Sequence, residues 1–146
     1  MTRRLALLCW LTVLATAASG LVGAYMNYML EPSDPFSAFN HPWQPKLDAA
    51  HALLGPGLAM VIGFVLAAHV RVEWRTGSSK RKSGAVLTTL AIALPTTGAI
   101  LAAYGAPDRP LLTWLHGVTG SLFLLMFVAH GLSAIRARRR AARSRR

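Results

Sequence analysis

Four of the five histidines in this sequence lie near the ends of two apolar segments that are long enough to cross a membrane. His51 and His69 belong to one segment, and His116 and His130 belong to the other. Ionisable side chains are costly at membrane depth, so they usually face the interior of a helix bundle and have a partner or a function. Imidazole is also a common axial ligand of haem iron. Two helices with an upper and a lower histidine each would therefore hold two haems, one near each surface of the bilayer.

The spacing of these histidines places both members of each pair on one side of their helix. At ~100° per residue, the 18-residue step from His51 to His69 returns to the same face, and the 14-residue step from His116 to His130 ends ~40° short of it. The two levels are ~27 Å apart on the first helix and ~21 Å apart on the second. Pro56 predicts a kink or break just inside His51, which would place His51 on a bent first turn or in the preceding loop. We therefore expect His69 and His130 to form the better-supported haem site.

A glycine follows each outer histidine at the same distance. His51 is followed by Gly55 and His116 by Gly120, so both sites read His-x-x-x-Gly. Residues four apart are neighbours on one face of a helix, and a glycine there leaves room for a flat macrocycle. Glycine also lets membrane helices pack closely, so the pattern alone does not decide between the two uses.

Four apolar segments each have close to the ~20 residues that a helix needs to cross a bilayer. Backbone groups must be satisfied internally in lipid, so all four are expected to be helices. The connecting loops are too short to form a soluble domain. The sequence therefore predicts a single all-α integral membrane domain over residues 1–146, a bundle of four transmembrane helices. The expected helices cover about residues 5–30, 49–70, 85–104 and 111–135, followed by a basic tail at 136–146.

The charged residues indicate the orientation of these helices. The chain has 16 Lys and Arg against 5 Asp and Glu, a net charge of +11, and the basic residues cluster outside the apolar segments. They precede the first helix, separate the second from the third and follow the fourth, regions that the positive-inside rule assigns to the cytoplasm. We expect both termini on the cytoplasmic side of a bacterial-type inner membrane, with the basic tail on anionic lipid rather than nucleic acid. On the opposite side, Asp48 is expected to cap the second helix.

The N-terminal segment has a second interpretation. Arg3 and Arg4, an apolar run and the small residues at 15–20 resemble a secretory signal with its cleavage site. Hydrophobicity continues as far as Leu30, which favours a helix that is retained in the membrane.

The four-helix plan and the paired histidines resemble the small transmembrane cytochromes b that serve bacterial formate dehydrogenases and hydrogenases. They are also similar to the haem-carrying bundle of respiratory cytochrome b, whose second and fourth helices each supply two ligands spaced by about fourteen residues. His116 and His130 match this spacing, whereas His51 and His69 exceed it by four residues. The resemblance implies a b-type cytochrome subunit of an oxidoreductase complex that carries electrons across the membrane between two haems b. It also implies exchange of electrons with quinone or with a partner redox subunit.

Two axial imidazoles leave no open position on the iron, which suits electron transfer. Haem propionates would seek cations, and the candidates are Arg71 and Arg136 at the inner level and Lys46 and Arg109 at the outer level. Asp108, in the outer turn, is either a proton acceptor for a quinol or an ordinary turn residue.

Two other functions remain open at this stage. One is a non-catalytic membrane scaffold or partner subunit whose histidines bind nothing. The other is a histidine-based metal or proton transporter, which would be expected to have acidic or amide partners at membrane depth. The central stretches of the helices lack Asp, Glu, Asn and Gln, which disfavours the transporter. Cys9 is the single cysteine, so an intrachain disulfide and a cysteine-based zinc site are excluded.

Overall fold

The chain folds almost entirely into helices. The computed structural model describes residues 2–76, 81–104 and 110–143, and no β-strand occurs among them. The elements are α1 (Arg3–Met29), α2 (Gln44–Val65), the π-helical turn η1 (Leu66–Val70), α3 (Arg71–Thr76), α4 (Arg81–Tyr104) and α5 (Pro110–Arg143). Four stretches are long and apolar enough to cross a membrane: Arg3–Met29, Gln44–Val70, Ser83–Tyr104 and Pro110–Ala137. The prediction of an all-α protein with four membrane-length helices is confirmed.

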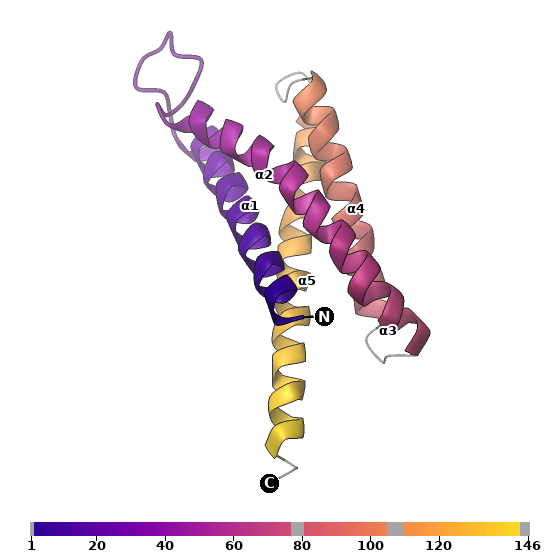
Figure 1. The fold of residues 1–146 in the computed structure, drawn as a ribbon. Coiled ribbons are helices and arrows are strands. Elements are labelled where there is room, and N and C mark those ends of the chain that lie inside the picture. Colours follow the sequence, from indigo (N-terminus) through magenta and orange to yellow (C-terminus); the bar gives the residue numbers. More distant parts are fainter. Residues whose placement is uncertain (1, 77–80, 105–109, 144–146) are drawn as a thin grey trace.

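The long helices form two hairpins, α1 with α2 and α4 with α5. Figure 1 shows α2 crossing from α1 at one end to α4 at the other, so that α2 joins the two hairpins. The core lies between the four helices, and its buried apolar side chains are Cys9, Val13, Leu58, Val61, Ile62, Ala91, Leu94 and Phe123. Many large apolar side chains elsewhere are exposed, among them Leu122 and Leu125 of α5. Lipid tails are as apolar as leucine, so outward-facing side chains of this kind suit a bilayer.

Aromatic side chains connect α1 with α5 in two places. Tyr28 stacks on Trp114 with their ring centres 5.4 Å apart, and Trp10 lies edge-on to Phe127 at 4.6 Å. Trp10 also covers Gly131 so closely that a Cβ atom on this glycine would overlap the indole ring. The absence of a side chain at Gly131 therefore lets α1 approach the C-terminal half of α5.

Helix α2 begins earlier than the sequence predicted. It starts at Gln44 after the N-cap residue Trp43, and Pro45 lies in its first turn. Proline is suited to that position because its φ angle is already helical and its missing N–H is not needed there. Gln44 is buried, and its Nε2 donates to Asn27 Oδ1 of α1 at 2.7 Å. Asp48 therefore lies inside the helix, and the prediction that it is the N-cap is wrong.

The early start of α2 also corrects the expected position of His51. His51 lies seven residues after Gln44, in the second turn of the helix rather than in a loop or a bent first turn. The helix continues through Pro56 without a break. Figure 1 shows α2 changing direction along its length, which is the ordinary consequence of a proline in a helix interior.

Two further differences lie toward the other end of the bundle. His69 belongs to the π-helical turn η1, which has more residues per turn than an α-helix. The 18-residue count from His51, which assumed α-helical geometry throughout, therefore does not fix the face on which His69 lies. Helix α5 continues to Arg143, so the basic tail expected from residue 136 begins as helix. Alanine and arginine are both strong helix formers, which accounts for the extension.

Candidate functional site

The outer histidine of the first hairpin, His51 of α2, lies against α1. Its Nδ1 is 3.0 Å from Ser19 Oγ and 3.0 Å from the carbonyl oxygen of Thr16. A carbonyl oxygen can only accept, so Nδ1 carries the proton and donates it. A Cβ atom placed on Gly20 would be 2.7 Å from His51 Cε1, closer than real Cβ contacts come. The imidazole is therefore seated directly on the α1 backbone.

The outer histidine of the second hairpin, His116 of α5, is held in the same way by α4. Its Nδ1 is 2.8 Å from Thr97 Oγ1. The Thr97 hydroxyl has the carbonyl oxygens of Ala93 and Leu94, 3.0 and 3.1 Å away, as acceptors for its proton, which is the usual bond of a helical threonine. Its oxygen therefore accepts from His116 Nδ1. A Cβ atom on Gly98 would lie 3.3 Å from His116 Cε1.

Each hairpin thus contains what we call a hydroxyl–glycine socket, namely Ser19–Gly20 in α1 and Thr97–Gly98 in α4. In both, the hydroxyl oxygen bonds the histidine of the facing helix and the adjacent glycine makes room for its ring. The sequence prediction missed these residues. The pattern that marks them is a hydroxyl residue followed by glycine within the first helix of each hairpin. In the first hairpin this pattern lies within residues 15–20, which the sequence analysis interprets only as resembling a secretory signal.

The two seated histidines meet between the hairpins. The ring centres of His51 and His116 are 6.2 Å apart, and their planes are inclined by 82°. A metal ion bound to the Nε2 atoms of two opposed imidazoles, with bonds of ~2 Å, holds the ring centres roughly 6 Å apart. With the proton on Nδ1, it is Nε2 of each ring that carries the lone pair with which an imidazole binds a metal. The residues present at this level therefore fit the axial ligand pair of a haem.

The inner histidines are placed differently. His130 of α5 has its Nδ1 3.4 Å from Ser83 Oγ of α4, and His69 is half-buried in η1. Both His69 and His130 have further interactions within the structure. The structure brings the rings of His51 and His116 together. The inner haem site stays a prediction.

The two glycines of the His-x-x-x-Gly pattern have room beside them. A Cβ atom on Gly55 would meet nothing within 4 Å, and one on Gly120 would meet only Leu94 Cδ2, at 3.5 Å. Neither glycine is required by the packing of the protein itself. Their predicted use as space for a macrocycle is compatible with these surroundings and stays a prediction.

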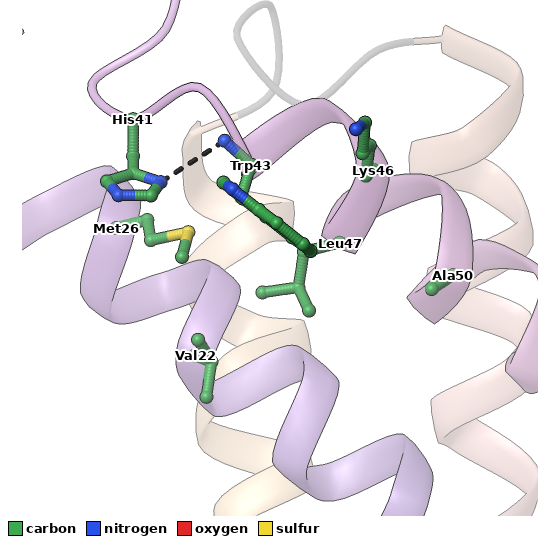
Figure 2. A pocket seen from close by; sticks show the side chains of 7 residues that line it. All are labelled: Val22, Met26, His41, Trp43, Lys46, Leu47 and Ala50. Carbon is green, nitrogen blue, oxygen red and sulfur yellow. Dashed lines mark hydrogen bonds between the residues drawn. The ribbon is translucent and has the colours of Figure 1, made fainter.

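A pocket of about 570 Å³ lies between the C-terminal part of α1 and the N-terminal part of α2. Figure 2 shows its lining, formed by Val22, Met26, His41, Trp43, Lys46, Leu47 and Ala50. The Lys46 ammonium lies 5.1 Å from the centre of the Trp43 ring. His41 Nδ1 accepts the Trp43 backbone N–H at 3.1 Å, so the proton of the ring lies on Nε2. The pocket is apolar inside and has hydrogen-bond donors at its rim. Lys46, expected to bind a propionate, lines this pocket, whereas Asp108 and Arg109 lie outside the described residues.

No family model, curated protein or solved structure matches the chain. The assignment of the site therefore rests on its geometry.

Proposed function

We propose that this protein is a b-type cytochrome of a bacterial-type inner membrane, in which His51 and His116 are the axial ligands of an outer haem. The observation that carries the proposal is the separation of 6.2 Å between the two imidazole centres, with both Nδ1 atoms bonded away from the shared space. A bound haem supplies a one-electron couple. His51 and His116 would hold this haem through two imidazoles, a ligation that suits electron transfer rather than binding of oxygen.

The inner site completes the proposal. His69 and His130 are the ligands of a second haem toward the other surface, so that the chain carries electrons across the bilayer. The distribution of basic residues supports placing both termini in the cytoplasm, where the arginines at the end of α5 contact anionic lipid headgroups. We further propose that the chain is an electron-transfer subunit of an oxidoreductase complex and binds no nucleic acid.

The outer pocket supports quinone as an electron-exchange partner. A quinone is apolar and flat, with carbonyl oxygens that need donors. The face of Trp43 offers a flat apolar wall, and His41 Nε2–H and the Lys46 ammonium offer donors at the rim. Leu47 and Ala50, which line the pocket, lie within one turn of His51 on α2. The pocket is therefore next to the proposed electron carrier, and a partner redox subunit is the alternative partner.

The first test is a dithionite-reduced minus air-oxidised visible spectrum of protein purified in detergent from haem-replete cells. We expect a sharp b-type α-band and about two haems per chain by pyridine haemochrome quantitation. One haem per chain would retain the cytochrome and remove one of the two sites. A folded but colourless protein would contradict the proposal and favour the scaffold function.

A graded pair of glycine substitutions tests whether the sockets position the ligands. Gly20→Ala forces His51 to move, because the new Cβ would lie 2.7 Å from its Cε1. Gly98→Ala asks for a shift of only a few tenths of an ångström at His116, where the distance is 3.3 Å. With overpacking costs of about 1–3 kcal/mol, we expect Gly20→Ala to weaken haem binding at the outer site roughly ten- to a hundredfold. Haem titration of the apoprotein measures this, and an equal effect of both variants would contradict the geometry.

A further inference from the structure

The two sockets differ in how many oxygen atoms hold the histidine. His51 Nδ1 has both Ser19 Oγ and the backbone carbonyl of Thr16 within 3.0 Å, and a side-chain substitution cannot remove the carbonyl. Among the described residues, the hydrogen-bond partner of His116 Nδ1 is Thr97 Oγ1 alone. The Ser19–Gly20 socket therefore keeps an acceptor for the histidine when its hydroxyl group is removed, whereas the Thr97–Gly98 socket has one hydroxyl group as its acceptor.

The proton positions at Thr97 follow from the geometry. A hydroxyl group has one proton, and helical threonine commonly donates it to a carbonyl of the preceding turn; Ala93 and Leu94 offer such carbonyls to Thr97 at 3.0 and 3.1 Å. When the proton is used in this bond, the hydroxyl oxygen accepts from His116, which places the imidazole proton on Nδ1. A neutral histidine in water prefers the opposite tautomer, with the proton on Nε2. Thr97 thus maintains the form in which Nε2 carries the lone pair.

We propose that Thr97 is a positioning residue of the outer site: it holds His116 in the Nδ1–H tautomer and thereby sets the reduction potential of the iron that His116 binds. When a neighbouring group accepts a hydrogen bond from the imidazole nitrogen that does not bind the metal, the other nitrogen becomes a stronger donor of electrons to the metal. A stronger donor stabilises ferric iron more than ferrous iron, which lowers the potential. The statement about the tautomer concerns the protein alone, whereas the statement about the potential rests on the proposed function.

The chain offers a matched set of variants. Thr97→Val has nearly the same shape but no acceptor, and Thr97→Ser restores the hydroxyl group. Thr96→Val is the control, because Thr96 bonds only its own helix, through the carbonyl of Ile92 at 2.9 Å, and its side chain is exposed. Ser19→Ala removes the corresponding hydroxyl group of the first socket and leaves the Thr16 carbonyl in place.

The first readout is ¹⁵N NMR of histidine-labelled, haem-free protein, with His116 assigned through a His116→Gln variant. We expect His116 to be in the Nδ1–H form in the parent protein, in Thr97→Ser and in Thr96→Val. In Thr97→Val its population shifts toward the Nε2–H form, whereas His51 keeps its tautomer in Ser19→Ala. An unchanged His116 tautomer in Thr97→Val would overturn the inference whether or not the protein binds haem.

The second readout is a potentiometric midpoint measurement on the haem-loaded protein. We expect Thr97→Val to raise the midpoint potential of one haem, Thr97→Ser to return it to the parent value and Ser19→Ala to move it much less. A tautomer change without any change in potential would overturn the electronic half of the inference. A tautomer change in a protein that binds no haem would support the positioning role and contradict the proposed function, so the two failures are distinguishable.

Discussion

His116→Ala is expected to bind about one haem per chain where the parent protein binds about two. In the proposed outer site His116 supplies one of the two axial nitrogens. His51, whose ring centre lies 6.2 Å from that of His116, cannot hold the iron in six-coordinate form alone. Pyridine haemochrome quantitation measures the loss, and low-temperature α-band spectra show which component disappears. His41→Ala is the matched control, because this histidine lines the outer pocket and is not a proposed ligand. Unchanged haem content in His116→Ala would remove His116 from the site.

The reciprocal variant, His130→Ala, tests whether the two sites are independent. It is expected to remove the inner haem and to leave most of the outer absorbance, because the sockets that hold His51 and His116 do not include His130. Equal loss of both components would contradict independent sites. If the parent protein binds only one haem, the variant that loses it shows whether that haem occupies the site of His116 or the site of His130.

Gly131→Ala is expected to destabilise the protein by about 1–3 kcal/mol. The new Cβ would overlap the indole ring of Trp10, which is held edge-on against Phe127 at 4.6 Å. Phe127 is itself stacked on Phe123 at 5.9 Å, so the aromatic cluster has little freedom to move and α1 must shift away from α5.

Thermal unfolding in detergent measures this effect. Gly117→Ala is the control on the same helix, because a Cβ there would meet nothing within 4 Å. Since alanine has a higher helix propensity than glycine, Gly117→Ala is expected to keep or slightly raise the stability. Equal melting temperatures for the two variants would show that the contact between Gly131 and Trp10 does not hold α1 in place.

The four helices could be predicted because membrane length and apolar composition are properties of continuous segments. The start of α2 could not be predicted, because proline suits both loops and the first turn of a helix, so Pro45 does not mark which of the two it belongs to. The turn η1 was also missed, since no residue type in Leu66–Val70 marks a π-helical turn.

The histidines of the candidate site were found from their type and spacing, and their partners were not. Which oxygen atom holds Nδ1 of His51 depends on how α1 rotates against α2, and a single sequence contains no direct record of that rotation. Pro56 suggested a disturbed His51, whereas the bend leaves His51 within an intact helix that is seated on Ser19 and Gly20.

The hydroxyl–glycine socket is present once in each hairpin, so each hairpin positions one imidazole of the facing pair. The relative placement of the two rings is therefore set by how the hairpins dock, and α2 is the helix that contacts α4 of the other hairpin. A substitution that shifts α2 against α4 would change the distance between the rings without altering either socket.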